Sequence, residues 1–544
     1  MNSHPKISKA VIAAAVLVAL FAVNFIIHLG FSPAFNPLTT DSGVFAYCGA
    51  RMLAGDVLYR DCWDNKPPAV YLIDAGIVAL GGQNPWAIWW FQLLWTTASS
   101  AVVFAVIRRV WRNWLAAALG ALLFIGTALT HFYYTGGNLT ENYLLLPLGL
   151  TAGALYASLT SGRLRWTAGM GLLTALAVLL KPTYFGMGAA AILTVVVFHF
   201  AQRKWTPGLK HLGVFMLGLI LPLALVALVF WRLGALSDLW FAVLQHNVGY
   251  VEAGLSRATL LASLRQFFVI QPLAGLFWTA LASLGIYGLV RALSKPAHSL
   301  SAPENLPAWW LGGLVLALPL QMASISISGK NFGHYYLEIM PALALLASAG
   351  PAVLLAPDGL KFPRSAHLHN GLRIGLALAL AALLAVWSKG LNAKELVNLP
   401  RLTSTAQNFD LWNYPFNDLE RYIQEHSRPD ESVLIWATHP DFNFVTGRRS
   451  PTRYIFPLHV LTPTPTGESG FPELLSELAA DPPRLIIQQV VSSANLPAFT
   501  APENELCGGC SPAARSGMEE LKAYIDAHYT YATQIYDWLV FVRK

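Results

Sequence analysis

The sequence predicts a polytopic α-helical membrane protein that ends in a soluble α/β domain. Of its 544 residues, 55% are hydrophobic and only 12% are charged, whereas soluble domains carry about a quarter charged residues. The apolar residues form long segments up to about residue 388, and from Lys389 the composition becomes that of a soluble protein. We therefore expect a transmembrane domain over 1–388 and an α/β domain over 389–544.

A spanning helix needs roughly 20 mostly apolar residues, and about eleven segments meet this requirement. The first, 10–29, is too long for the core of a signal peptide and lacks a small-residue cleavage site, so we expect an uncleaved helix. The segment 70–81 is too short to span and contains Asp74, which favours an interfacial or re-entrant helix. The predicted spans are 10–29, 85–107, 114–130, 142–160, 166–184, 186–201, 212–233, 267–290, 309–328, 336–356 and 371–388.

The distribution of lysine and arginine between the loops predicts the orientation. With the N-terminus in the cytoplasm, the cytoplasmic loops hold more of these residues than the external ones, as expected for a membrane protein. The first loop and the C-terminal domain then share the periplasmic or extracellular face of the cytoplasmic membrane. The net charge of +7 follows from these loops, and no basic or stacking motif indicates a nucleic-acid partner.

The C-terminal part alternates helical and strand patterns, which predicts a small layered α/β domain. No glycine-rich phosphate loop follows any of its strands, which argues against nucleotide binding. Cys507 and Cys510 lie in a glycine-rich loop and form either a local disulfide or two free thiols. The predicted helices are 416–425, 471–480 and 517–528, and the predicted strands are 432–437, 484–490 and 536–542.

The first external loop, 39–75, is unusually rich in charged residues for a connection between apolar segments. Asp41 begins a helical pattern, so it is either an N-cap or a functional carboxylate. An ionised carboxylate near the membrane surface suits a general base, and Lys66 would supply a fixed cation for a leaving phosphate. Pro67 and Pro68 stiffen the chain and start the next helix.

This loop resembles the first external loop of the GT-C glycosyltransferases, in particular the protein O-mannosyltransferases and the lipid A aminoarabinose transferases. Those enzymes transfer a sugar from a polyprenyl monophosphate to an acceptor outside the cytoplasmic membrane. This chain has Asp41-Ser42 where the family usually has Asp-Glu. The resemblance rests on Asp41, Tyr47, Arg51-Met52-Leu53, Gly55-Asp56, Lys66-Pro67-Pro68 and Tyr71, and the order of spans agrees over about 10–390.

The resemblance implies that Asp41 is the catalytic carboxylate and that Lys66 contacts the donor phosphate. Glu141 is either a plain helix-start residue or the second acid of the family, which orients the acceptor or Asp41. Lys181 either snorkels to the interface or joins Lys330 as a further cation near the phosphate. The residues expected to bind donor or acceptor are Tyr47, Arg51, His246, His334 and Tyr335. For His334 and Tyr335 the alternative is a place in the aromatic belt at the membrane interface.

Two further features of the external loops concern metals and thiols. Asp41 and Glu141 together would suit magnesium or manganese, because hard cations prefer oxygen ligands, although no cluster has the spacing of a metal site. Cys48 and Cys62 form either a bridge that pins the interfacial helix to the segment before Lys66, or two buried thiols.

The favoured function is an inverting transfer of a hexose or pentose from a polyprenyl-phosphate sugar to an acceptor hydroxyl of a glycolipid such as lipid A or lipopolysaccharide, of a polysaccharide, or of a protein. The first alternative is a lipid or sugar transporter or flippase. Transporters place ionisable residues at mid-span, whereas here they gather at the external ends of the spans. The second alternative is a non-catalytic scaffold whose working part is the C-terminal domain.

Overall fold

The computed structural model describes residues 9–38, 40–254, 256–293, 302–355, 416–462, 464–490 and 512–544. The tertiary contacts divide the chain into two compact units. Unit 1 consists of the described parts of 1–31, 92–225 and 255–407, and unit 2 of those of 32–91, 226–254 and 408–544. The predicted domain boundary at residue 388 lies outside the described residues and stays a prediction.

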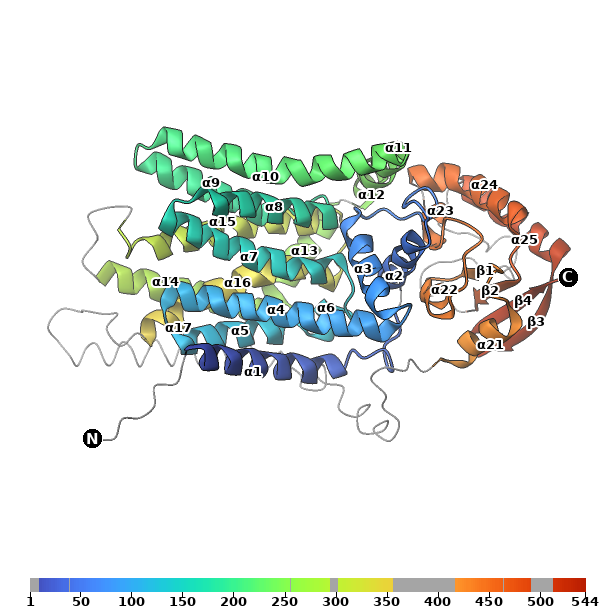
Figure 1. Ribbon diagram of the computed structural model, residues 1–544, viewed down its shortest axis with the longest axis horizontal. Helices are drawn as coiled ribbons and strands as arrows, with labels where there is room; N and C mark the ends of the chain where they lie inside the picture. Colours follow the sequence, from blue (N-terminus) through green and yellow to red (C-terminus); the bar gives the residue numbers. More distant parts are fainter. Residues whose placement is uncertain are drawn as a thin grey trace. The chain divides into compact units, whose positions relative to one another are not determined.

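Unit 1 is built from helices alone in the part of it that the structure describes (Figure 1). Two of its helices, α4 (Pro85–Trp111) and α10 (Trp205–Arg232), begin or end in unit 2. The others are α1 (Lys9–Leu29), α5 (Trp114–Ala128), α6 (His131–Tyr134), α7 (Thr140–Ser161), α8 (Leu164–Leu180), α9 (Gly186–Ala201), α13 (Arg257–Val269), α14 (Leu273–Leu293), α15 (Leu306–Ser326), η2 (Gly333–Ile339), α16 (Met340–Ala347) and α17 (Ala349–Leu354).

Seven segments of the described residues are long and apolar enough to cross a membrane, which confirms a multi-span helical fold. The predicted spans 114–130, 166–184 and 186–201 correspond to the shorter apolar helices α5, α8 and α9. The predicted span 371–388 lies outside the described residues. The total of eleven spans and their orientation therefore remain predictions.

Two predicted spans are interrupted at prolines. The segment 267–290 is divided between α13 and α14, because Pro272 lacks an amide hydrogen and disfavours helical geometry at the residue before it. The segment 336–356 starts in the 3-10 helix η2 and continues as α16 and α17, which carry Pro341 and Pro351 near their first turns. Proline fits best there.

The surface of α10 shows what kind of solvent surrounds unit 1. Its side chains Leu217, Leu221 and Leu225 are 61%, 62% and 59% exposed. A continuous apolar surface of this kind is rare on soluble monomers, whereas lipid chains solvate leucine well. The helix α10 therefore faces the hydrocarbon of a bilayer.

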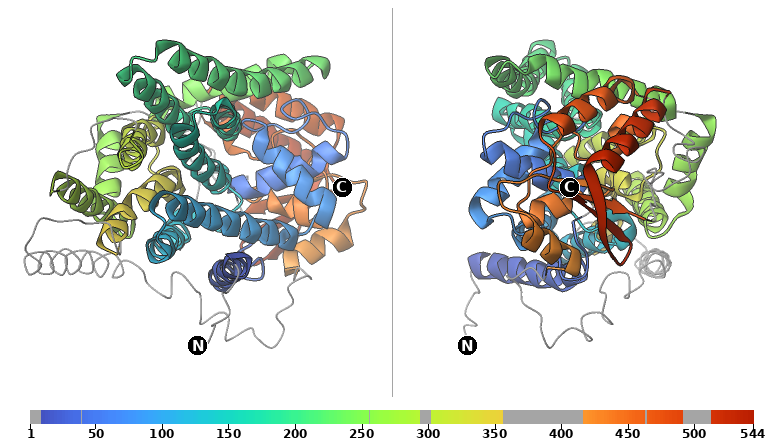
Figure 2. Two further views of the ribbon diagram at one scale, coloured as in Figure 1. Left: turned by 60° about the vertical axis from the view of Figure 1, so that its left-hand side comes forward. Right: turned by 90° about the vertical axis from the view of Figure 1, so that its right-hand side faces the viewer.

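Unit 2 combines the first loop of the chain with its C-terminal part. Its sheet has the order β1-β2-β4-β3, in which only β1 and β2 are parallel, and Figure 2 shows the β3–β4 ribbon in the right-hand view. The elements are α2 (Thr40–Leu53), α3 (Ala69–Gly81), α11 (Leu236–Trp240), η1 (Phe241–Gln245), α12 (His246–Gly254), α21 (Asp418–His426), β1 (Val433–Trp436), α22 (Asp441–Thr446), α23 (Leu458–Leu461), α24 (Pro465–Ala480), β2 (Leu485–Gln489), α25 (Pro512–His528), β3 (Tyr529–Ile535) and β4 (Trp538–Arg543).

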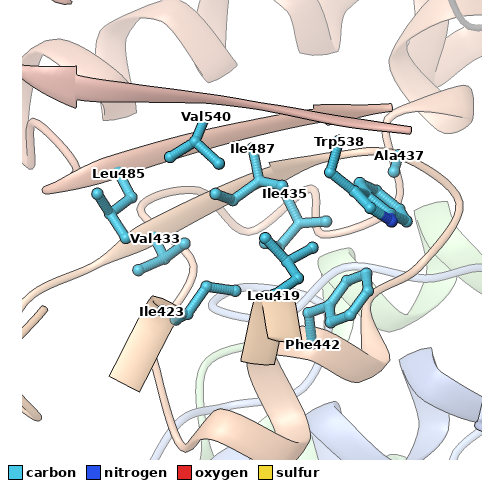
Figure 3. Packing of buried hydrophobic residues seen from close by; sticks show 10 residues of the cluster. All are labelled: Leu419, Ile423, Val433, Ile435, Ala437, Phe442, Leu485, Ile487, Trp538 and Val540. Carbon is cyan, nitrogen blue, oxygen red and sulfur yellow. The ribbon is translucent and has the colours of Figure 1, made fainter. Parts of the chain in front are cut away.

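The sheet is buried on both faces, as successive side chains of β1 and β2 show. On one face, Ile435 and Ile487 pack against Leu419 of α21 and Phe442 of α22 (Figure 3). On the other, Trp436 meets Phe471 of α24. All the predicted helices and strands of the α/β part are present, and the structure adds α22, α23 and β3, which the sequence analysis missed.

The strand β3 escaped prediction because its side chains are mostly polar and exposed. Only Tyr529 is buried, since β3 is an edge strand that pairs with β4 alone. Without an alternating apolar pattern the sequence offers little signal for a strand.

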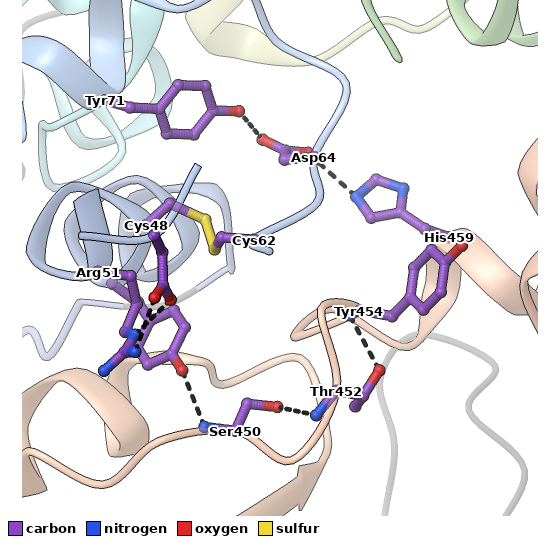
Figure 4. The surroundings of a disulfide bond; sticks show 11 residues. Cys48, Arg51, Cys62, Asp64, Tyr71, Ser450, Thr452, Tyr454 and His459 are labelled. Carbon is purple, nitrogen blue, oxygen red and sulfur yellow. Dashed lines mark hydrogen bonds and ion pairs between the residues drawn. A yellow bond between two sulfur atoms is a disulfide. The ribbon is translucent and has the colours of Figure 1, made fainter. Parts of the chain in front are cut away.

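In unit 2 the first loop folds as two helices in close contact. The helices α2 and α3 match the predicted helical pattern after Asp41 and the predicted interfacial helix, and Pro68 directly precedes α3. A Cβ atom at Gly49 of α2 would lie 2.7 Å from the backbone nitrogen of Ala75 in α3, so only glycine permits this approach. Cys48 and Cys62 form a disulfide (Figure 4), which resolves the two alternatives left by the sequence.

Replacing both cysteines in a Cys48→Ser, Cys62→Ser variant should destabilise unit 2 by about 3 kcal/mol, the value expected for a closed loop of this length. The bridge joins residues 14 apart in the sequence. Thermal unfolding in detergent, with and without reductant, measures this effect. Reductant should lower the midpoint of the wild type but not of the variant; an equal fall in both would assign the effect to other cysteines.

Candidate active site

The two residues singled out in the first loop meet in unit 2. Asp41 lies in the first turn of α2, and its Oδ2 is 3.7 Å from Nζ of Lys66. The side chains are 38% and 21% exposed, respectively. At this distance the contact is an ion pair without a short hydrogen bond. A carboxylate and an ammonium group are therefore adjacent and accessible, as a base and a phosphate-binding cation would need to be.

The position of Lys66 depends on its neighbours along the chain and on α12. Its Nζ donates to Oδ1 of Asn65 at 2.9 Å, and its carbonyl oxygen accepts from the Tyr59 hydroxyl at 2.7 Å. Asn247 of α12 donates to the Asn65 carbonyl oxygen at 2.8 Å and accepts from its side-chain amide at 3.2 Å. Both the backbone and the ammonium group of Lys66 are thereby oriented.

A buried network lies directly before Lys66 (Figure 4). Asp64 is 3% exposed and accepts a hydrogen bond from the Tyr71 hydroxyl at 2.5 Å, while its other oxygen lies 3.1 Å from Nε2 of His459. Burial alone would raise the pKa of Asp64, but the charge of Lys66 and the contact with His459 outweigh it and hold that pKa well below its usual range. Asp64 thus stays ionised.

His246 lies beside this network. Its ring packs against Trp63 and lies 5.9 Å from the ring of His459, and its Nδ1 is 2.8 Å from Oγ1 of Thr466. Burial lowers the pKa of His246 to about 3, and the proximity of His459 acts in the same direction. His246 is therefore neutral at physiological pH.

Tyr47 and Arg51, both predicted to bind donor or acceptor, make contacts within the protein. The Tyr47 hydroxyl accepts from the backbone amide of Ser450 at 2.8 Å. Arg51 donates to both carboxylate oxygens of Asp56, at 2.7 and 3.0 Å. These contacts hold α2 in place, and a binding role for either residue stays a prediction.

Unit 1 brings together three other predicted residues. Glu141, at the start of α7, accepts from Lys181 at 3.3 Å and from the Tyr184 hydroxyl at 2.5 Å. The Lys181 ammonium lies 3.4 Å from the centre of the Tyr335 ring, a cation–π contact. Because the side chain of Glu141 is only 4% exposed, these partners compensate a buried charge.

The remaining predicted residues lie in the segment between α15 and α16. The ring of His334 stacks on that of Phe332, and the backbone amide of Lys330 donates to Oγ of Ser328 at 3.3 Å. The segment also contains a buried carboxylate that the sequence analysis did not single out. Glu338 accepts from Ser324 at 2.8 Å and is 1% exposed.

The structure therefore brings Asp41 to Lys66 in unit 2, and Glu141 to Lys181 and Tyr335 in unit 1. The expected metal ion between Asp41 and Glu141 stays a prediction, because the two residues belong to different units. No group of three or more His, Cys, Asp or Glu side chains suited to a metal occurs in the part of the chain that the structure describes. Asp64 could be noticed in the sequence as one of the charged residues of the first external loop. Nothing in the sequence, however, predicts its contact with His459.

Comparisons with known proteins bear on the fold and on the enzyme class. A model of the family described as dolichyl-phosphate-mannose-protein mannosyltransferase matches residues 65–230. ArnT from Cupriavidus metallidurans, solved bound to undecaprenyl phosphate, aligns with 98% of this chain and 97% of its own, at 15% identity and a TM-score of 0.57. The arabinosyltransferase EmbB from Mycobacterium smegmatis aligns with 73% of this chain and 40% of its own, at 13% identity and a TM-score of 0.40. No curated protein matches.

The alignment with ArnT, over nearly the whole of both chains, confirms the predicted GT-C fold. The predicted enzyme class, a glycosyltransferase, is also that of the family matched by residues 65–230.

The neutral, buried His246 should make the stability of unit 2 fall as the pH falls below about 6.5. In that range the unfolded chain binds a proton that the folded state excludes down to about pH 3, so stability decreases by up to about 1.4 kcal/mol per pH unit from this group. Melting temperatures between pH 7 and 4.5 measure the slope. A His246→Asn variant, which keeps an amide near Thr466, should show a flatter profile. An unchanged slope in that variant would contradict the assignment.

Proposed function

We propose that this chain is a membrane glycosyltransferase that moves a sugar from a polyprenyl-phosphate donor to a hydroxyl group of an acceptor at the external membrane face, with inversion at the anomeric carbon. The observation that carries the proposal is the accessible pair of Asp41 and Lys66 at 3.7 Å, on a fold shared with ArnT. ArnT itself was solved with undecaprenyl phosphate, which supports the same lipid class for the donor here.

In the proposed reaction the donor phosphate replaces Asp41 as the partner of Lys66. Asp41 is then available to accept the proton of the acceptor hydroxyl as its oxygen attacks the anomeric carbon. The bond between that carbon and the phosphate oxygen breaks, and the electron pair remains on the polyprenyl phosphate, where Lys66 stabilises the added charge. Because phosphate leaves as an anion, the step requires no general acid.

Glu141 and Lys181 in unit 1 have a different role in the proposed reaction. The carboxylate of Glu141 already accepts hydrogen bonds from Lys181, Tyr184 and Thr140. Because its oxygens are occupied, it is poorly placed to take up a proton. In this proposal Glu141 orients Lys181. The ammonium group of Lys181 would add positive charge near the donor phosphate. Lys330, His334 and Tyr335 remain proposed contacts of the donor or acceptor.

An Asp41→Asn variant should lose roughly 100-fold or more in transfer rate, the contribution of a positioned general base. Donor binding should persist or tighten, because the amide no longer competes for Lys66. Release of labelled sugar from polyprenyl-phosphate donors and equilibrium donor binding measure the two effects. The matched control is Asp61→Asn, in the same loop, since Asp61 forms an exposed ion pair with Arg60 and accepts a hydrogen bond from the Val57 amide, away from Lys66. If the wild type neither binds nor consumes such donors, the proposal fails and a transport assay becomes the next test.

A Lys66→Met variant should lose both donor affinity and turnover, the latter by roughly 100- to 1,000-fold, as for removal of one charge-stabilising donor. Methionine keeps most of the length and apolar stem of lysine, so packing should change little. The same assays apply, with Arg60→Met as the control in the same loop. Normal donor affinity in Lys66→Met would refute a role for Lys66 at the phosphate.

A further inference from the structure

A groove of about 770 Å³ lies in unit 1, and none of the candidate-site residues lines it. Its walls come from α1, α4, α7 and the start of α5, and Figure 1 draws α1 and α4 in blue. Leu17, Leu20 and Phe104 contribute apolar surface, and Arg108 and Arg109 contribute positive charge. The groove therefore joins a hydrocarbon-like wall to a basic rim.

Arg108 is the most unusual side chain of this groove. It is half-buried, and its guanidinium carbon lies 4.6 Å from the centre of the Trp114 ring. Its Nε is buried and has no hydrogen-bond partner among the described residues. A buried donor without an acceptor is costly, and arginine in particular is suited to a planar, bidentate anion. Arg108 lines the groove, so its guanidinium group borders the space in which an anion would lie.

The positive charge at this rim is not compensated by the described residues. Arg108, Arg109 and Arg112 all line the groove. None of them belongs to an ion pair formed within the described residues. Three uncompensated guanidinium groups at one end of a groove favour a ligand with a negatively charged head.

The arginines lie at the end of α4 that is farthest from Pro85. The helix has 27 residues, and at about 1.5 Å per residue it is long enough to cross a bilayer. Arg108 and Arg112 therefore lie at the membrane boundary opposite the one where α4 begins. Loop arginines are common at the cytoplasmic boundary, but that tendency explains neither the buried Nε of Arg108 nor the apolar groove beside it.

We propose that this groove binds an anionic glycerophospholipid. The phosphate of the lipid would contact Arg108, Arg109 and Arg112, and an acyl chain would lie along the apolar surface of α1 and α4. Basic sites between transmembrane helices recognise anionic lipid headgroups by this combination of charge and apolar surface. The site is distinct from the pair of Asp41 and Lys66 and would tie lipid composition to the stability of the bundle.

Native mass spectrometry of the full-length protein tests the proposal with phosphatidylglycerol and phosphatidylcholine of identical acyl chains. Phosphatidylglycerol should be retained in preference. An Arg108→Gln, Arg109→Gln, Arg112→Gln variant should lose this preference by about tenfold or more. The charge-matched control, Arg163→Gln, Arg165→Gln, Arg203→Gln, removes exposed arginines elsewhere in unit 1 and should change it by about twofold or less. Equal losses in both variants would overturn the site in favour of non-specific attraction.

A second variant keeps all three charges and blocks the groove. Ala105 of α4 lines the groove and is exposed, so Ala105→Trp should fit without disturbing the core and should weaken phosphatidylglycerol binding. Glycerol phosphate, which has the same charged group without acyl chains, should bind too weakly to detect. Unchanged lipid retention in Ala105→Trp, or firm binding of glycerol phosphate, would contradict a lipid site and indicate a simple phosphate site.

Discussion

The contact between α2 and α3 is the constraint on which the proposed chemistry depends, because it determines how close Asp41 comes to Lys66. The absence of a side chain at Gly49 lets α2 approach the backbone of α3, and the disulfide between Cys48 and Cys62 fixes the intervening loop to α2. Loss of either would weaken the packing that holds the carboxylate next to the ammonium group. The resulting pair is close enough to interact and open enough to exchange partners with a substrate phosphate.

The C-terminal part of the chain supports this arrangement from within the same unit. Trp63 donates its backbone amide to the carbonyl oxygen of Arg453 at 2.9 Å, and Asp64 contacts His459. A buried carboxylate is costly unless it is paired and hydrogen-bonded. Asp64 therefore ties the residues before Lys66 to α23, and the C-terminal part completes the structure that holds the lysine.

Charge compensation distinguishes the two ends of unit 1. Glu141 accepts from Lys181 and from Tyr184, so the buried carboxylate has its partners within the protein. Arg108 retains a buried donor without a partner among the described residues. An internal ion pair orients side chains around a site, whereas the arginines that line the apolar groove and have no ion pair among the described residues support the proposed anionic lipid.

The sequence by itself determined the class of the fold, most helices and the two residues that form the central pair. Apolar length specifies a spanning helix and alternation specifies a buried strand, and both are local properties. The polar edge strand β3 and the interruptions near Pro272 and Pro341 were missed, since packing and proline geometry override the apolar pattern there. Only the tertiary structure decided that Asp64 meets His459, 395 residues away, and that the cysteines are bridged. Such contacts depend on the distance between segments in space, which no local pattern encodes.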